Sequence, residues 1–189
     1  MPTEFCRAPG RLPLDLRQTC HRLGVLPSRF VLLVDVSTQQ MHLVQPLAGF
    51  VAPDCLTRKS FRVSTSRFGV GAKKNSNCTP PGLHRVKEKI GGGWPMGAVF
   101  KSRALAGYTW NGVRDAAITN RILWLEGLEP GVNRGGNVDT FARYIYIHGT
   151  GDEPSLGRPA SRGCIHLSAA DLLPLYDLIP PGTLVWIAG

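Results

Sequence analysis

The spacing of hydrophobic and polar positions changes near residue 28. Upstream, apolar residues recur at intervals of four, four and three, at Leu12, Leu16, Cys20 and Leu23. This spacing places them on one face of a short helix, which a glycine and a proline then end. Downstream, the helical period gives way to short β-rich runs. The pattern therefore predicts an N-terminal extension, residues 1–28, followed by a main domain, residues 29–189.

Short segments rich in β-branched and aromatic residues dominate the main domain. The predicted strands are Phe30–Val36, Gln40–Val44, Phe61–Thr65, Leu83–Lys87, Arg121–Glu126 and Arg143–His148. Turns rich in glycine and proline separate them, including Thr79-Pro80-Pro81-Gly82. This arrangement is typical of a mainly β (α+β) domain, resembling a largely antiparallel sandwich or barrel with one or two short helices.

A second helix is predicted at residues 168–178. Ser168 can cap its N-terminus, and Asp171 is the acidic partner three positions later. Pro174 lies inside the segment and should kink or shorten the helix.

Charge and composition narrow the classes of partner. The chain has 22 Lys and Arg against 13 Asp and Glu, a formal net charge of +9, which favours an anionic partner. No long basic run or nucleic-acid motif accompanies this charge, so nucleic acid is not the expected partner. No stretch reaches the roughly 18 apolar residues of a membrane span, and the first residues lack the apolar core of a secretory signal.

Five cysteines, Cys6, Cys20, Cys55, Cys78 and Cys164, are widely separated and form no Cys-x-x-Cys pair. The spacing therefore excludes a zinc knuckle and a thioredoxin-like motif. The first four could form up to two disulfides in an oxidising compartment, with a connectivity that spacing does not decide.

The candidate chemistry lies in two neighbouring segments near the C-terminus. His148 ends an alternating strand and is followed by Gly149, and Cys164 follows Gly163. A thiol needs a nearby base or positive charge to act as a nucleophile, because a free cysteine has a pKa of about 8.5. His148 suits a general base. Gly163 leaves the approach to the thiol open, so the N–H groups of Gly163 and Cys164 are candidates for an oxyanion hole.

These segments resemble the signature of YkuD-type L,D-transpeptidases. The resemblance rests on His-Gly-Thr at 148–150 and on Gly-x-Pro-Ala-Ser-x-Gly-Cys-Ile-x-Leu at 157–167. The Thr-Pro-Pro-Gly turn at 79–82, the hairpin beginning at Val34 and the closing strand from Gly182 agree with it, in the family's order, over roughly residues 30–187.

The resemblance implies that Cys164 attacks a donor stem tetrapeptide of peptidoglycan, forming a thioester and releasing D-alanine. An amine acceptor would then take the acyl group, His148 would move the protons, and the Gly149 carbonyl would orient its ring. It further implies peptidoglycan stem peptides as partners, acylation of Cys164 by carbapenems, and a location in the periplasm or cell envelope. No cofactor or metal is expected, and the oligomeric state stays open.

Substrate contacts are expected from residues around the two segments, namely Ser161, Arg162, His166, Tyr146 and Trp110. The family most often has His at the position of Arg162 and Arg at that of His166, so the basic residues are partly exchanged here. Because histidine is smaller than arginine and largely neutral at pH 7, this exchange bears on substrate preference. The segment 91–120 corresponds by position to the family's lid, and its Lys101, Arg103 and Arg114 could meet substrate carboxylates.

Three alternatives remain on sequence grounds. Hydrolysis of the same thioester would make the protein an L,D-carboxypeptidase. A relative that binds peptidoglycan without turnover is the second, since fold does not imply function. A zinc site formed by Cys164, His166 and His148 is the third, although no fourth ligand lies at motif spacing.

Overall fold

The computed structural model describes residues 8–48, 52–112 and 117–189. Its strands are β1 (Ala8–Arg11), β2 (Val31–Asp35), β3 (Gln40–Pro46), β4 (Asp54–Arg62), β5 (Gly82–Ile90), β6 (Ala98–Lys101), β7 (Ala104–Tyr108), β8 (Thr119–Gly127), β9 (Tyr146–Gly149), β10 (Ile165–Leu167) and β11 (Leu184–Ala188). The helices are α1 (Leu14–Leu23) and α2 (Ala169–Leu178), with 3₁₀ turns η1 (Thr109–Asn111), η2 (Gly136–Val138) and η3 (Glu153–Ser155).

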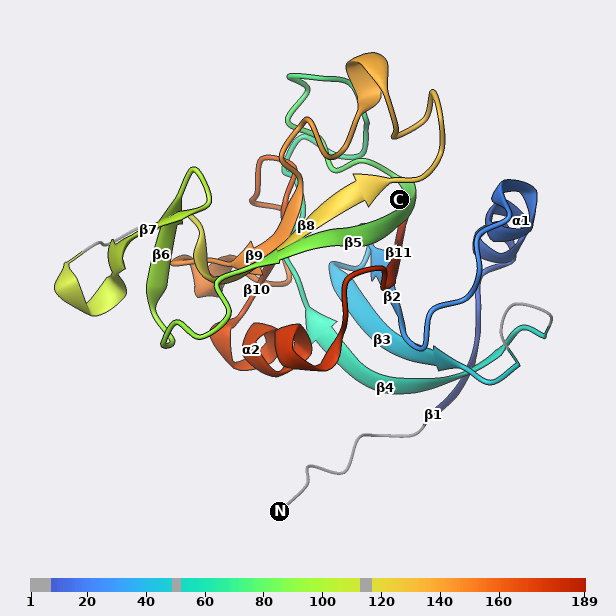
Figure 1. Cartoon of the computed structure of the whole chain (residues 1–189), viewed down its shortest axis with the longest axis horizontal. Helices are drawn as coiled ribbons and strands as arrows, with labels where there is room; N and C mark the ends of the chain where they lie inside the picture. Colours follow the sequence, from blue (N-terminus) through green and yellow to red (C-terminus); the bar gives the residue numbers. More distant parts are fainter. Residues whose placement is uncertain (1–7, 49–51, 113–116) are drawn as a thin grey trace.

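The strands form one mixed sheet in the order β1-β4-β3-β2-β11-β5-β8-β6-β7, and β9 and β10 continue from β8 beside this path (Figure 1). Most neighbours are antiparallel, as the turn-rich sequence predicts. Two pairs, β11 with β2 and β10 with β9, are parallel. Parallel neighbours need a long connection, and the segments between the partners, which include α2 in the case of β11, supply it.

Alternate residues of the central strands enter two cores on opposite faces of the sheet. Along β2, Leu32 and Val34 join the core that α2 covers, whereas Val31 belongs to the core that α1 covers. Strand β11 divides its residues in the same way. Because successive side chains point to opposite faces, a strand covered on both sides is apolar throughout. This explains the continuous Val-Leu-Leu-Val run of β2.

A third cluster forms where the β6–β7 hairpin meets the edge of the sheet. Ile122 and Trp124 of β8 and Tyr146 of β9 belong to it, whereas their neighbour Leu123 faces the α2 core. The hairpin projects from the body of the protein at the left of Figure 1. Cys164 packs against this third cluster. The candidate nucleophile therefore lies on the face of β8 and β9 opposite α2.

The N-terminal segment is integrated with the sheet. β1 pairs with β4, and Leu16 and Cys20 of α1 pack with Val31 and Leu184 in the second core. Arg22 of α1 forms a 2.8 Å ion pair with Glu129, whose carboxylate also accepts from the Leu83 N–H. The boundary at residue 28 remains a prediction, but the described part of residues 1–28 packs as part of the same body.

Several predicted elements agree with the structure and others need correction. The two helices and most predicted strands appear within a few residues of their expected bounds. Of the strand predicted at Phe61–Thr65, only Phe61 and Arg62 belong to a strand, as the end of β4, which starts at Asp54. The 91–120 segment holds the β6–β7 hairpin, although glycines interrupt its pattern. α2 runs its full predicted length through Pro174 and is not shortened by it.

The side chain of Ser168 caps α2 as the sequence predicts. Its hydroxyl accepts a 3.1 Å hydrogen bond from the Asp171 N–H and donates to the Asp171 carboxylate. We expect Ser168→Ala to lower the free energy of unfolding by about 1 kcal/mol, since a lost N-cap typically costs this much. Urea denaturation would measure the change, with Ser168→Thr, which keeps the hydroxyl, as the matched control. An equal loss in both variants would contradict the assigned cap.

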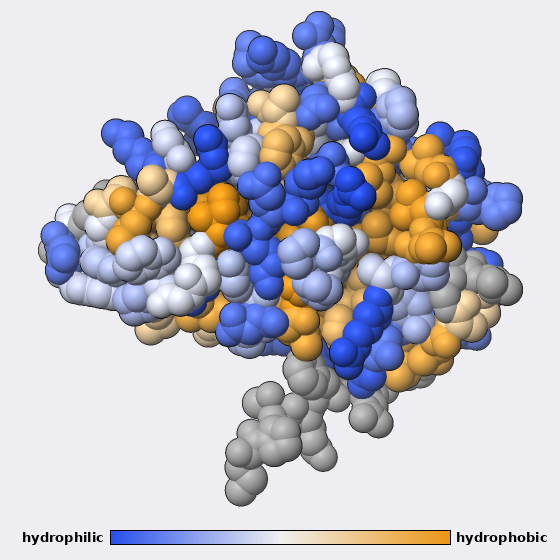
Figure 2. All heavy atoms as spheres, viewed as in Figure 1, coloured by the Kyte–Doolittle hydropathy of each residue, from blue (hydrophilic) through white to orange (hydrophobic). Residues whose placement is uncertain are grey.

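On the face seen in Figure 2, hydrophobic and hydrophilic side chains both reach the surface in interleaved patches. Among the described residues no helix is long and apolar enough to cross a membrane.

Candidate active site

The parallel pairing of β9 with β10 brings two histidines side by side. His148 and His166 are register partners, and their ring centroids lie 4.7 Å apart. Tyr146 lies two residues before His148 on the same face of β9, and its ring meets the His148 ring edge-on at 6.3 Å. The alternation of β9 thus places Tyr146 and His148 toward the third cluster and Ile147 toward the α2 core.

Cys164 sits at the end of a tight loop just before β10. Gly163 has φ of 117°, and a side chain there would meet the Ile145 side chain at 3.1 Å and the Cys78 carbonyl at 3.2 Å. Only glycine fits this position without strain. The hydroxyl of Thr79, from the Thr-Pro-Pro-Gly turn, donates to the Gly163 carbonyl at 3.1 Å. The turn motif therefore supports the loop that carries Cys164.

Ser161 holds the same loop from within. It is buried, its hydroxyl donates to the Cys164 carbonyl at 2.6 Å, and it accepts from the Gly163 N–H at 3.2 Å. The Gly163 N–H is therefore already engaged in the free protein. Among the described residues no acceptor hydrogen-bonds the Cys164 N–H. Of the two candidate oxyanion donors, the N–H groups of Gly163 and Cys164, only the second is therefore available.

The Cys164 thiol is enclosed by backbone groups of the strand beside it. The Tyr146 N–H donates to Sγ at 3.4 Å, and Sγ donates to the Tyr144 carbonyl at 3.6 Å. Burial raises the pKa of the Cys164 thiol to about 11, against the smaller opposing effects of the Tyr146 N–H and the Arg143 charge. The thiol is therefore protonated at neutral pH and needs a base in order to attack a carbonyl.

The orientation of the His148 ring suits it to accept a proton. Its Nδ1 lies 2.8 Å from the Gly149 carbonyl. A carbonyl oxygen can only accept, so Nδ1 carries the proton and Nε2 is left with a free lone pair. Burial, reinforced by His166, lowers the pKa of His148 to about 3. The ring is neutral at pH 7 and able to accept a proton.

His166 provides a neutral neighbour to this base. Burial lowers the pKa of His166 to about 4, although Asp152 opposes the shift, and its Nδ1 has no hydrogen-bond partner among the described residues. A permanently charged arginine at this position would oppose the formation of a His148 imidazolium more strongly than a neutral ring does.

An open pocket of about 330 Å³ joins these groups. Its lining consists of Ala117, Ile118, His148, Thr150, Asp152, Ala160, Ser161, Arg162, Cys164 and His166. Five residues singled out from the sequence therefore share it: His148, Ser161, Arg162, Cys164 and His166. Tyr146 is buried and does not belong to the lining. Trp110 is 60% exposed and stacks on Tyr108 at 4.5 Å, also outside the lining.

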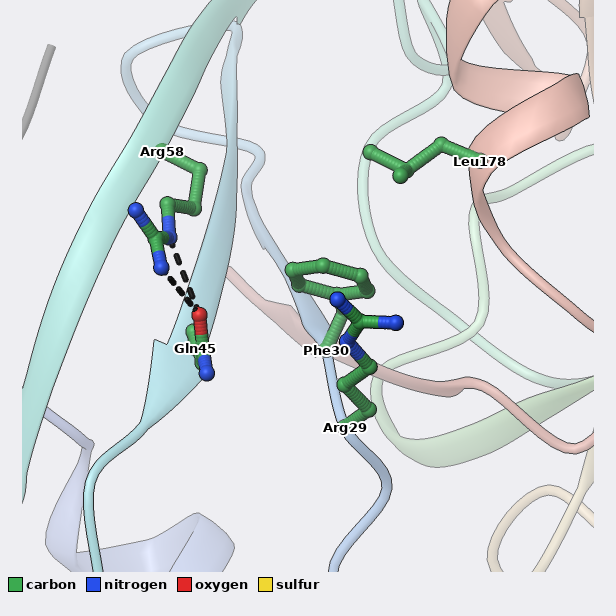
Figure 3. Close-up of a pocket in the computed structure, with 5 residues that line it drawn as sticks. All are labelled: Arg29, Phe30, Gln45, Arg58 and Leu178. Carbon is green, nitrogen blue, oxygen red and sulfur yellow. Dashed lines mark hydrogen bonds between the residues drawn. The ribbon is translucent and has the colours of Figure 1, made fainter. Parts of the chain in front are cut away.

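A second cavity, of about 220 Å³, lies between the strand ends around Phe30 and the end of α2 (Figure 3). Arg29, Gln45, Arg58 and Leu178 complete its lining, and Arg58 donates to the Gln45 side chain. None of the residues singled out from the sequence as candidates for acyl transfer lines this second cavity.

The described cysteines, Cys20, Cys55, Cys78 and Cys164, are free thiols, and Cys6 lies outside the described residues. Within the same ranges no group of three His, Cys, Asp or Glu residues could hold a metal ion. Arg114 also lies outside the described residues.

The sequence analysis did not identify Arg143 and Tyr144 as residues that interact with the Cys164 thiol. The Arg143 guanidinium donates to the Cys78 carbonyl at 2.8 Å and to the Gly71 carbonyl at 3.3 Å, and its charge favours the Cys164 thiolate. Tyr144 has φ of 57°, a conformation that a bulky residue adopts only when its surroundings impose it. Both were included in a predicted strand, and no local motif distinguishes them.

Comparisons with known proteins agree with this geometry. The family model of the YkuD L,D-transpeptidase catalytic domain matches residues 29–187. The YkuD protein of Bacillus licheniformis, whose name refers to the same activity, is 46% identical over 41 residues, which are 22% of this chain and 25% of that protein.

Two solved structures share the fold. Bd1075 of Bdellovibrio bacteriovorus has a TM-score of 0.55 at 16% identity, covering 96% of this chain and 53% of that one. L,D-transpeptidase 3 of Mycobacterium tuberculosis, in complex with a faropenem-derived adduct, has a TM-score of 0.50 at 15% identity, covering 85% and 60%. The chain thus spans less than two thirds of the length of these relatives. Since the family model covers most of the sequence, this chain belongs to the YkuD family of L,D-transpeptidase catalytic domains.

Proposed function

We propose that the protein is a peptidoglycan L,D-transpeptidase that uses Cys164 as its nucleophile. The observation that carries the proposal is the pairing of a protonated thiol with a neutral histidine, oriented by the Gly149 carbonyl, in one open pocket. A nucleophile, a base and a group that orients the base form the constellation that covalent acyl transfer requires.

In the first half-reaction, Sγ of Cys164 attacks the carbonyl carbon of the donor stem tetrapeptide that precedes D-alanine. The thiol proton passes to Nε2 of His148, and the carbonyl oxygen becomes an oxyanion that accepts from the Cys164 N–H. When the intermediate collapses, the carbon–nitrogen bond breaks. His148 returns the proton to the leaving amine, so D-alanine departs and a thioester remains.

In the second half-reaction, the amine of an acceptor stem attacks the thioester carbon and gives a proton to His148. Collapse breaks the carbon–sulfur bond, and the proton returns to Sγ. Water in place of the amine would give a tripeptide, which is the carboxypeptidase outcome. Peptidoglycan lies in the cell envelope, so we propose the periplasm or cell envelope as the place of action.

The decisive experiment incubates the protein with a disaccharide tetrapeptide and follows products and intact protein mass. We expect cross-linked dimers with released D-alanine, and a thioester adduct on the wild-type protein. Cys164→Ala should give neither. Cys78→Ser is the matched control, because it changes a half-buried thiol outside the pocket lining and should retain turnover.

The relative crystallised with a faropenem-derived adduct motivates a second readout on the same samples. A penem or carbapenem should add its mass to the wild type and to Cys78→Ser, and not to Cys164→Ala. Tripeptide without dimers would assign hydrolysis instead of transfer. Absence of every product and every adduct in the folded wild type would overturn the proposed function in favour of a non-catalytic binding role.

A further inference from the structure

Arg103, at the tip of the β6–β7 hairpin, packs on two aromatic side chains, one of which, Trp124, belongs to the cluster that Cys164 contacts. The guanidinium carbon of Arg103 lies 4.9 Å from the ring centroids of both Trp124 and Tyr144. The charge of its guanidinium also interacts with the Tyr146 side chain. An arginine stacked on two aromatic faces is held in place by cation–π attraction while its outer N–H groups stay available.

The backbone of the hairpin tip is shaped to present this side chain. Ser102 and Arg103 are the two turn residues between β6 and β7, with φ of 49° and 69°. Such turns favour Asn-Gly, because positive φ is unfavourable for residues with larger side chains. Keeping Ser-Arg here costs backbone energy, which the contacts of Arg103 with three aromatic residues offset.

Two of the residues that interact with the Arg103 side chain also hydrogen-bond the Cys164 thiol. The Tyr144 carbonyl and the Tyr146 N–H are the hydrogen-bond partners of Cys164 Sγ. Within the described ranges no carboxylate lies at ion-pair distance from Arg103, and Glu88 acts on it only as a more distant charge. Within the described part of the chain, the Arg103 cation therefore has no ion-pair partner, and it packs on residues whose backbone groups contact Sγ.

The direction of the proposed reaction determines which part of the substrate meets this cation. His148 must reach the leaving amine to protonate it, so the leaving group belongs on the pocket side of Sγ that His148 and His166 line. Tyr144 and Arg103 do not line this pocket, so an acyl half that extends past the Tyr144 carbonyl would approach Arg103. His166 is neutral and cannot supply a permanent charge for either half.

We propose that Arg103 binds a free carboxylate on the acyl half of the donor stem peptide and thereby selects donors in which this carboxylate is not amidated. The inference rests on the proposed function, since it requires a stem peptide as donor. Because the acyl half stays attached to Cys164 through both half-reactions, Arg103 would hold it before and after the leaving group departs.

The test compares donor tetrapeptides whose acyl-half carboxylates are free with the same peptides amidated at those positions. We expect the wild type to prefer the free acid by roughly 10- to 100-fold in kcat/KM, the range of a hydrogen bond between charged groups. Arg103→Gln should remove this preference by slowing only the free-acid donor. Arg103→Lys should keep part of it, because it keeps the charge without the fork geometry.

Arg134→Gln is the matched control, since Arg134 is an exposed arginine outside the pocket lining. It should leave the preference unchanged. An equal slowing of both donors by Arg103→Gln would assign Arg103 a purely structural role and overturn the inference, as would a wild type that uses both donors equally. No turnover of either donor and no Cys164 adduct would instead overturn the proposed function itself.

Discussion

Replacing His148 with glutamine is expected to lower the rate of Cys164 acylation at pH 7 by about 10²- to 10⁴-fold, the usual contribution of a general base. The expectation follows from the enclosed thiol, whose pKa of about 11 leaves almost no thiolate at neutral pH. Without the neutral ring, attack depends on the small thiolate fraction. The residual rate should therefore rise about tenfold per pH unit in the variant, while the wild-type rate stays nearly flat between pH 6 and 8.

Acylation by a chromogenic β-lactam, followed at several pH values, measures both quantities. His21→Gln, an exposed histidine on α1, is the control and should behave like the wild type. A wild-type rate that climbs with pH as steeply as that of His148→Gln would show that free thiolate, and not general-base catalysis, drives the attack.

Acidification from pH 7 to pH 5 is expected to destabilise the protein by several kcal/mol. Burial is the main cause that lowers the pKa of His84 to about 4, of His148 to about 3 and of His166 to about 4, from an ordinary value of 6.5. Below pH 6.5 these histidines bind protons in the unfolded chain but not in the folded protein. The free energy of unfolding therefore falls as the pH falls toward the folded-state pKa values. Each buried histidine contributes about 2 kcal/mol by pH 5.

Urea denaturation at the two pH values tests this expectation. His84 lies outside the active site, with Nδ1 on the Gly82 carbonyl and Nε2 at 3.2 Å from the Thr140 hydroxyl. His84→Gln cannot titrate, and its loss of stability between pH 7 and pH 5 should be smaller than that of the wild type by about 2 kcal/mol. Equal losses would exclude His84 as a source. Measurements at pH 5 and above exclude contributions from the titration of Asp35 and Asp139, because the pKa values of both carboxyl groups are lowered and they titrate only in more acidic solution.

The sequence pattern predicts those elements that are determined by residues close together in the chain. The Val-Leu-Leu-Val run of β2, the Ser168 cap with Asp171, and the alternation that puts Tyr146 and His148 on one face follow from spacing alone. The same holds for the motifs around Cys164 and His148. Their convergence in one pocket agrees with the family signature, while their catalytic roles remain proposals.

Contacts between distant segments could not be predicted. β1 has the sequence Ala-Pro-Gly-Arg, which lacks strand propensity and is ordered by pairing with β4. The parallel pairing of β10 with β9 decides that His166 faces His148, and nothing in either segment specifies that partner. The charge interaction of Arg143 with Cys164 and the stacking of Arg103 on Tyr144 both join segments distant in the sequence, so they are properties of the tertiary structure.

The enclosure of Sγ between the Tyr146 N–H and the Tyr144 carbonyl also affects the chemical durability of the enzyme. Peroxides and small electrophiles attack thiolates, and a thiol that stays protonated is a poor target for them. In the proposed mechanism the Cys164 proton is removed only when His148 and a bound carbonyl act together, so the thiol would be protected from oxidation between turnovers. A nucleophile of this kind can persist in an oxidising environment without a reducing partner to regenerate it.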